Sequence, residues 1–213
     1  MRYNLVIFDC DGTLVDSEPV TMKLIAQMML EMGVSKEPSE LYDMFAGKNM
    51  SFITDFVESQ IGLFDKISFE QDYRKRCVTM FEQELLPIPG VKNLVQSLQV
   101  PTCVASNGPH EKMDITLAVT GLDRSFTKDR IFSAYDIQKW KPDPALINYV
   151  LDKMNCRAQD AVLIEDTMSG IQAGLNANVD TLAYNPHQIE EISQCGVMNF
   201  ASMEDIKSYL ENS

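Results

Sequence analysis

The sequence predicts an α/β fold in which an open parallel sheet forms the core and a helical domain is inserted. Four short segments consist almost wholly of apolar residues, as in strands covered on both faces, at residues 5–8, 102–105, 161–164 and 181–184. Helical patterns separate the later strands, near residues 110–120, 143–154 and 169–177. This alternation is typical of right-handed βαβ units around a parallel sheet.

The segment from residue 17 to residue 86 interrupts this alternation, because it has helical periodicity without clear strands. Apolar residues recur at every fourth position in two series. One is Val20, Leu24, Met28 and Met32, and the other is Phe69, Tyr73, Cys77, Phe81 and Leu85. Each series marks the buried stripe of a helix. We therefore expect a core domain of residues 1–16 and 87–213 and a helical domain of residues 17–86.

Composition and charge exclude several classes of function. A chain of 213 residues with 45% hydrophobic residues can bury a large core. Its formal net charge of −13 argues against nucleic acid as a partner. No apolar run reaches the roughly 18 residues that cross a bilayer, and the five cysteines lack metal or disulfide spacing. We expect a cytoplasmic monomer that binds no membrane and keeps its thiols reduced.

The strongest chemical signal is the motif Asp9-Cys10-Asp11-Gly12-Thr13, which directly follows the first apolar segment. Both carboxylates then leave the carboxyl edge of the sheet, where open α/β folds bind ligands. Two acids at this spacing can divide the work, because one can attack phosphorus while the other holds a proton for the leaving oxygen. A simple turn stabilised by aspartate side chains is the alternative interpretation.

A second pair of acids, Glu165 and Asp166, lies where another apolar segment ends and a helical pattern begins. With Asp9, they form a set of oxygen ligands that suits Mg²⁺. Alternatively, the two acids are exposed or cap the helix, and capping can coexist with metal binding.

Two further groups are candidates for binding phosphate. The segment Ser106-Asn107-Gly108 ends a predicted strand and offers a hydroxyl and backbone N–H groups, although it also reads as a plain turn. Lys141 is fixed in the sequence Trp140-Lys141-Pro142-Asp143-Pro144, whereas an isolated lysine is usually a surface charge. A fixed lysine suits neutralisation of a transferring phosphoryl group. Lys48 is a weaker candidate for substrate binding from the helical domain.

Taken in order, these motifs resemble the four signature motifs of the haloacid dehalogenase superfamily. The resemblance implies a Rossmann-like core, a mobile helical cap and phosphatase activity. The roles that it implies are a nucleophile and metal ligand at Asp9, and a general acid and base at Asp11 that also binds metal through its carbonyl. Ser106 and Lys141 would hold phosphate, and Asp166 would complete the metal site with Glu165, directly or through water.

Longer segments, residues 8–18 and 131–144, resemble members of this superfamily that act on phosphorylated sugar acids, so 6-phosphogluconate is the expected substrate. A phosphomutase resembling β-phosphoglucomutase is the nearest alternative. That enzyme has histidine and arginine where this chain has Thr21 and Met50. Because the chain lacks a second cationic side chain for the far end of a bisphosphate, we expect water to accept the phosphoryl group. A catalytically silent binding module is the second alternative, although every chemical group is retained.

Overall fold

The computed structural model describes residues 2–45 and 50–213. The chain divides into two compact units, one formed by Met1–Val15 with Pro87–Ser213 and the other by Asp16–Leu86. This division differs by one residue from the boundary expected after residue 16.

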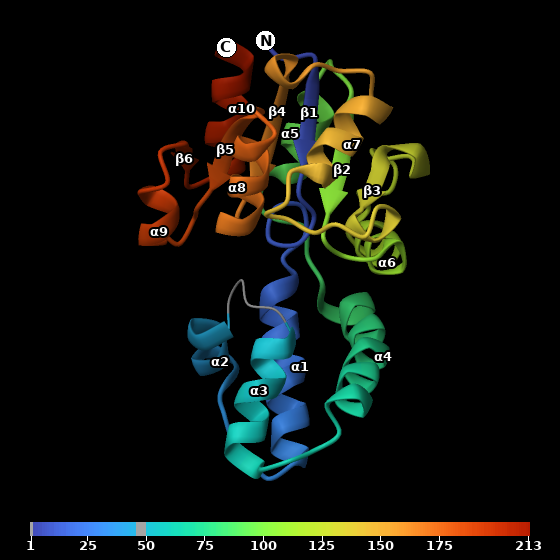
Figure 1. The fold of residues 1–213 in the computed structure, drawn as a ribbon, viewed down its shortest axis with the longest axis vertical. Helices are drawn as coiled ribbons and strands as arrows, with labels where there is room; N and C mark the ends of the chain where they lie inside the picture. The colour runs from blue at the N-terminus through green and yellow to red at the C-terminus, as the bar shows by residue number, and fades with distance from the viewer. Residues whose placement is uncertain (1, 46–49) are drawn as a thin grey trace. The chain divides into compact units, whose positions relative to one another are not determined.

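A six-stranded, wholly parallel sheet is the centre of the first unit (Figure 1). The strand order is β3-β2-β1-β4-β5-β6, which is the order of a doubly wound Rossmann-like fold. The strands are β1 (Leu5–Phe8), β2 (Thr102–Ser106), β3 (Ile131–Ser133), β4 (Ala161–Glu165), β5 (Asp180–Tyr184) and β6 (Met198–Phe200). The predicted α/β class is therefore confirmed.

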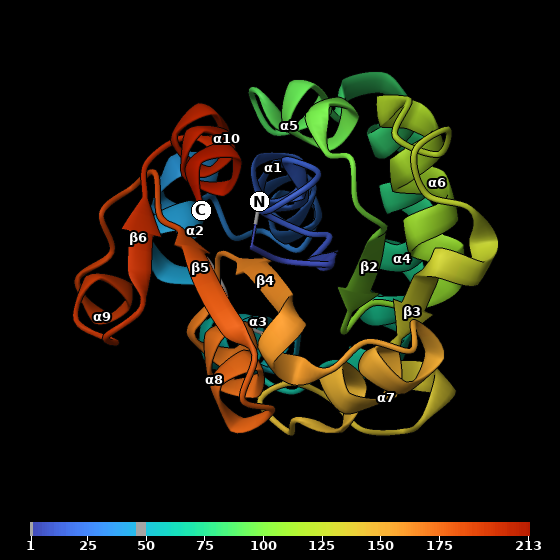
Figure 2. The same cartoon turned by 90° about the horizontal axis from the view of Figure 1, so that it is seen from above.

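Helices cover both faces of this sheet (Figure 2). One face carries α7 (Ala145–Lys153) and α8 (Met168–Asn176). The opposite face carries α5 (Val91–Ser97), α6 (His110–Thr120) and α10 (Met203–Asn212), and the short α9 (Glu190–Ser193) lies near the β6 edge. Because both faces are covered, β1, β2 and β4 are buried along their whole lengths, as their continuous apolar sequences predicted.

A hydrophobic core lies between the sheet and helices α7 and α8. Leu5, Ile7 and Leu163 of the sheet pack there against Leu146 and Ala173 of the two helices. Alternate strand residues face the other side of the sheet, where Phe8 meets the edge of Phe126 at 6.0 Å between ring centroids. A rigid sheet packed on both faces gives its carboxyl edge a fixed geometry.

The second unit is helical and consists of α1 (Ser17–Glu31), α2 (Pro38–Phe45), α3 (Met50–Ile61) and α4 (Lys66–Glu84). Helix α1 packs against α2 and α4. Val20, Leu24 and Met28 are buried on α1, and so are Phe69, Cys77 and Phe81 on α4, as the fourfold spacing predicted. Tyr73 is only half-buried, and of the two residues just beyond the helix ends Leu85 is buried and Met32 half-buried. Asp65 caps α4 by accepting a 3.0 Å hydrogen bond from the backbone N–H of Ser68.

The chain leaves and re-enters the first unit at neighbouring residues. Val15 forms an antiparallel bridge with Pro87, and the backbone N–H of Ile88 donates to the carbonyl of Leu14 at 3.0 Å. Within the second unit, the N–H of Asp16 likewise donates to the carbonyl of Leu86 at 2.9 Å. The two connections are therefore paired side by side.

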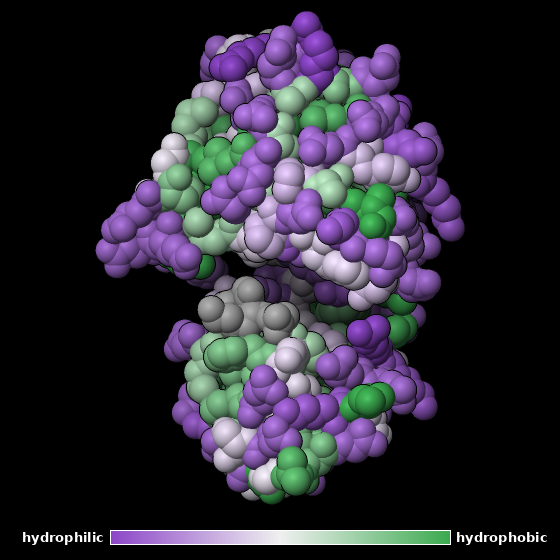
Figure 3. Space-filling view, in the orientation of Figure 1, coloured by the Kyte–Doolittle hydropathy of each residue, from purple (hydrophilic) through white to green (hydrophobic). Residues whose placement is uncertain are grey.

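The visible surface is mostly hydrophilic, with scattered apolar side chains (Figure 3). In the second unit, exposed apolar side chains include Leu30, Leu63 and Ile67. Over residues 2–45 and 50–213, none of the helices combines the length and apolar character that a membrane span requires.

Candidate active site

The candidate site lies at the carboxyl ends of β1 and β4, where the strand order of the sheet reverses. Ligands of open α/β sheets bind at this switch point, because the loops after the two strands diverge and leave a crevice. Asp9 directly follows β1, and Glu165 is the last residue of β4. The backbone N–H of Asp9 donates to the carbonyl of Ile164 at 3.0 Å, which fixes the two strand ends against each other.

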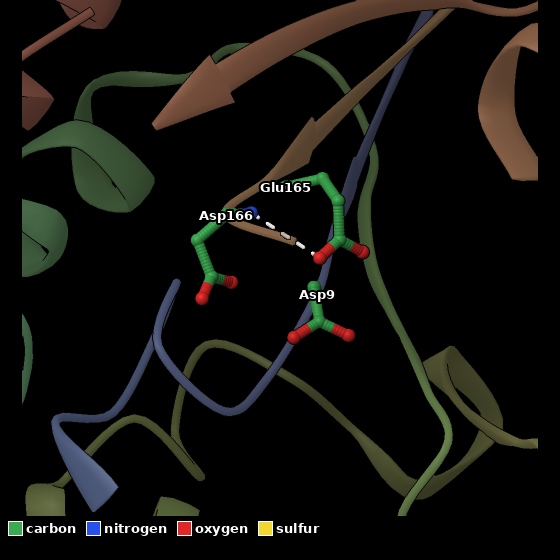
Figure 4. A group of neighbouring side chains, drawn as sticks. All are labelled: Asp9, Glu165 and Asp166. Atoms are coloured by element: carbon green, nitrogen blue, oxygen red, sulfur yellow. Dashed lines mark hydrogen bonds between the residues drawn. The ribbon is translucent and has the colours of Figure 1, made fainter. Parts of the chain in front are cut away.

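Three carboxylates converge at this point (Figure 4). Asp9, Glu165 and Asp166 each present one oxygen, and these atoms lie within 4.8 Å of one another. Asp9 is 7% exposed and Glu165 is 1% exposed, so the charges are largely removed from water. Negative oxygens gathered this closely repel one another unless cations accompany them, and this donor set suits a hard divalent ion such as Mg²⁺.

Lys141 supplies one such cation. Its Nζ donates to Oδ1 of Asp9 at 2.6 Å and to Oε2 of Glu165 at 2.7 Å, and its side chain is 2% exposed. Burial alone would lower the pKa of Lys141, but the two carboxylates outweigh that effect and raise the pKa above its ordinary value. The ammonium is therefore charged and is fixed beside Asp9.

The environment of Asp9 opposes its ionisation. Burial and the negative charge of Glu165 raise the pKa of Asp9 to about 7, although Lys141 acts in the opposite direction. A buried carboxylate beside an ammonium is poorly hydrated, which favours its use as a nucleophile once additional positive charge is bound.

Both oxygens of Glu165 accept hydrogen bonds from the protein. Oε2 accepts from Lys141, and Oε1 accepts from Oγ1 of Thr167 at 2.8 Å and from the backbone N–H groups of Thr167 and Asp166 at 3.1 and 3.2 Å. Thr167 also caps helix α8 by accepting from the N–H of Gly170 at 3.1 Å. Glu165 is thus held in one orientation, whether or not it also contacts a metal.

Gly170 provides the space that Glu165 occupies, because a Cβ at this position would overlap the Glu165 carboxylate. We expect Gly170→Ala to lower kcat about 10- to 100-fold, since displaced Glu165 no longer positions Lys141. Gly174→Ala, on the same helix, is the matched control, because its Cβ would meet Thr181 and Leu163 instead. Both variants should lose thermal stability, but only Gly170→Ala should lose turnover per folded molecule. Equal kcat values for the two variants would contradict this explanation.

The loop after β1 fixes the third carboxylate. Oγ1 of Thr13 donates to Oδ1 of Asp166 at 2.7 Å. Gly12 has a φ of 82°, and a Cβ there would overlap the Asp166 carboxylate. Glycine is needed at this position both for the left-handed backbone and for the close approach. The first motif, residues 9–13, and the pair Glu165-Asp166 are far apart in the sequence but are therefore in direct contact in the fold.

The end of β2 and the turn that follows it lie near Asp11. Ser106 is buried, and its Oγ accepts from the N–H of Gly108 at 3.0 Å. A Cβ on Gly108 would lie 3.3 Å from Oγ of Ser106 and 3.8 Å from Oδ2 of Asp11, so these groups line one small region. The side chain of Asn107 bonds to the backbone of Lys141, accepting from its N–H at 2.9 Å and donating to its carbonyl at 3.4 Å.

Sequence reasoning missed one charged neighbour, Lys112, whose Nζ donates to Oδ2 of Asp11 at 2.8 Å. No motif marks this lysine, and only the start of helix α6 at His110 brings it near the loop. Lys48 lies outside the described residues. The other candidates come together at the carboxyl edge of one sheet, namely Asp9, Asp11, Ser106, Asn107, Gly108, Lys141, Glu165 and Asp166.

Comparison with known proteins defines the class of this chain. Residues 6–184 match the haloacid dehalogenase-like hydrolase family, so the chain belongs to that family. It is 36% identical over 189 residues to the 6-phosphogluconate phosphatase of Escherichia coli K12, and the match covers 87% of this chain and 85% of the relative.

Solved structures show the same fold. A haloacid dehalogenase-like protein of unknown function from Agrobacterium tumefaciens is 25% identical, with a TM-score of 0.85 and coverage of 99% of this chain and 98% of that chain. A putative β-phosphoglucomutase from Thermotoga maritima is 21% identical, with a TM-score of 0.82 and coverage of 98% and 99%, respectively. At that identity, the second likeness is one of fold alone.

Proposed function

We propose that this enzyme is a Mg²⁺-dependent phosphatase that hydrolyses a small phosphate monoester through a phospho-aspartate on Asp9. The observation that carries the proposal is the contact between the buried Asp9 carboxylate and Lys141, beside Glu165 and Asp166 at the switch point of the sheet. A nucleophile and a fixed cation are thus adjacent where the fold binds ligands. The family match supports hydrolysis as the reaction class.

In the first half of the reaction, a carboxylate oxygen of Asp9 attacks phosphorus and the bond from phosphorus to the alcohol oxygen breaks. Lys141 balances the charge on the phosphoryl oxygens, which Ser106 and the backbone N–H groups after β2 help to bind. Asp11 gives a proton to the departing alcohol oxygen. The products of this half are the free alcohol and phosphorylated Asp9.

In the second half, water attacks the phosphorus of the phospho-aspartate, and Asp11 takes up the proton that this water loses. The bond between phosphorus and the Asp9 oxygen breaks, which releases inorganic phosphate and restores both aspartates. Asp11 acts as an acid in one half and as a base in the other, so its protonation state returns to the start.

The residues proposed to hold Mg²⁺ are Asp9 and Asp166, the backbone carbonyl of Asp11, and Glu165 directly or through water. Their oxygen-only chemistry and close spacing fit this ion. When bound, the ion would neutralise the carboxylates and polarise the phosphoryl group.

Metal binding has a readout apart from activity. If Mg²⁺ binds the folded chain only, a concentration 100 times its Kd stabilises the chain by about 2.7 kcal/mol, which raises Tm by about 5–10 °C. Asp166→Asn should abolish most of this shift, whereas Asp160→Asn, next to the other end of β4 and paired with Arg157, should keep it. A full shift in Asp166→Asn, measured by thermal denaturation, would exclude this residue from the metal site.

For the substrate, we propose a sugar phosphate or sugar-acid phosphate, with 6-phosphogluconate as the leading candidate. The similarity to the Escherichia coli 6-phosphogluconate phosphatase supports this choice. A β-phosphoglucomutase-like activity is less favoured, because the chain has Thr21 and Met50 where the mutase has histidine and arginine. In the structure, Oγ1 of Thr21 lies 3.2 Å from the hydroxyl of Tyr73 within the helical unit.

Three assays on the purified protein separate these functions. Phosphate release from an aryl phosphate, present with Mg²⁺ and lost with EDTA, is the result expected for a phosphatase. Interconversion of sugar-phosphate isomers without phosphate release would indicate a mutase, and inertness in both assays would favour a silent binding module. A panel of phosphorylated metabolites, headed by 6-phosphogluconate, then identifies the substrate.

We propose that residues 17–86 form a substrate-binding cap, to which Lys48 belongs, and that the enzyme works as a cytoplasmic monomer. The net charge of −13 supports a small-molecule substrate rather than nucleic acid. Size-exclusion chromatography with light scattering tests the oligomeric state directly.

A further inference from the structure

Lys112 lies in the first turn of helix α6 and reaches back to the loop after β1. Side chains near the start of a helix point toward its N-terminus, which brings Lys112 over the turn formed by Ser106, Asn107 and Gly108. Its Cδ lies 3.8 Å from the point where a Cβ of Gly108 would be, and its Nζ lies 2.8 Å from Oδ2 of Asp11. The stem of Lys112 therefore lies at van der Waals distance from the loop, and its ammonium lies at hydrogen-bond distance from Asp11.

The two lysines that contact the acids of the site differ in accessibility. The side chain of Lys141 is 2% exposed and is held by two carboxylates, so moving it would leave buried charges without their partner. The side chains of Lys112 and Asp11 are 32% and 30% exposed. An ion pair at such exposure contributes little stability, so Lys112 can exchange Asp11 for an anion of the ligand at small cost.

The position of Lys112 determines which part of a substrate it can contact. In the proposed reaction, Asp11 gives its proton to the alcohol oxygen, so an ammonium held beside Asp11 lies toward the alcohol part of the substrate. The phosphoryl part has its own proposed partners in Lys141 and Ser106. A lysine on the alcohol side is therefore suited to a second negative charge on the same substrate.

We propose that Lys112 determines specificity for phosphate monoesters whose alcohol part carries a carboxylate, by releasing Asp11 and binding that carboxylate. This inference rests on the proposed phosphatase function and deepens it. It predicts that the enzyme distinguishes two matched phosphate monoesters. In the first, called the acid, the alcohol part carries a carboxylate; in the second, called the neutral partner, a hydroxymethyl group replaces that carboxylate and the alcohol part is uncharged.

The test uses Lys112→Met with two matched pairs of substrates, 6-phosphogluconate with glucitol 6-phosphate and phosphoglycolate with 2-hydroxyethyl phosphate. The readout is the ratio of kcat/KM for the acid to that for its neutral partner. Loss of a charged hydrogen bond should lower this ratio about 10- to 100-fold in at least one pair, mainly through the KM of the acid. Lys112→Arg should restore part of the ratio.

Lys128→Met is the matched control, because it removes an equal charge from an 89% exposed side chain that pairs with Asp114 at 3.6 Å. It should leave the acid-to-neutral ratio within twofold of the original protein. The inference is overturned if Lys112→Met leaves both ratios unchanged, or if it lowers activity on acids and neutral esters equally. Absence of phosphate release from all four esters and from an aryl phosphate would instead overturn the proposed function, and the inference with it.

Discussion

Asp9→Asn is expected to lose turnover on the order of 10⁴-fold or more while remaining folded. The amide has nearly the same shape as the carboxylate but lacks the negative charge that, in the proposed reaction, attacks phosphorus. Steady-state phosphate release measures the loss. Acid-quenched samples of the original protein, incubated with substrate, should also carry a phosphoryl group on the peptide that contains Asp9.

Asp114→Asn is the control for this substitution, because it makes the same chemical change on an exposed part of helix α6. It should keep turnover within about twofold of the original protein, as surface substitutions usually do. Asp9 would lose its assignment as nucleophile if the Asp9→Asn variant kept substantial turnover, or if the phosphoryl group were found on another peptide.

Removing the Asp9 charge should also change how stability depends on pH. The pKa of Asp9 is raised from 3.8 to about 7 in the folded protein, so folding takes up a proton between these values. The stability contributed by Asp9 is therefore fully present below pH 4 and is lost as pH rises through 7. In EDTA, the free energy of unfolding of the original protein should fall by on the order of 2 kcal/mol between pH 5 and pH 8, relative to that of Asp9→Asn over the same range.

Lys141→Met should have the largest effect on stability. Asp9 and Glu165 are both buried, and Lys141 is the cation that contacts both carboxylates. Breaking a buried ion pair by removing one partner costs about 3–5 kcal/mol, because the remaining charges are left uncompensated. Urea denaturation in EDTA measures this loss, and turnover should fall with it because the phosphoryl group loses its fixed cation.

A second substitution distinguishes this electrostatic cause from loss of packing. Glu165→Gln removes one of the two buried negative charges, so Lys141→Met combined with Glu165→Gln should be more stable than Lys141→Met alone. Lys207→Met, which removes the half-buried partner of the exposed Glu211, should cost less than about 1 kcal/mol. A double variant no more stable than Lys141→Met would contradict the electrostatic explanation.

The central strands could be predicted from the sequence because burial on both faces leaves a continuous apolar run, as in β1 and β4. The edge strands β3 and β6 were not predicted. Each has three residues, and β6 is partly exposed along its length, so neither gives a periodic signal that differs from a loop. Strand order likewise depends on pairing between distant segments, which no local pattern contains.

The candidate site was predictable where charged residues stand at fixed places relative to strand ends, as Asp9 and Glu165 do. Sequence alone did not show that one oxygen of Glu165 accepts from Lys141 while the other accepts from Thr167, because those contacts arise only in the folded chain. It also gave no sign that Asn107 holds the backbone of Lys141. Lys112 was missed because its approach to Asp11 depends on how helix α6 leaves the sheet.

The bridge between Val15 and Pro87 has a consequence for the history of such enzymes. A chain that departs and rejoins at adjacent points accepts inserts of very different length there, since each doubling of a flexible loop adds only about 0.6 kcal/mol of closure entropy. Recombination can therefore exchange the whole intervening module while the chemical machinery stays intact. The segment between residues 16 and 86 can in this way change in length and sequence while the acids at the carboxyl edge of the sheet keep their places.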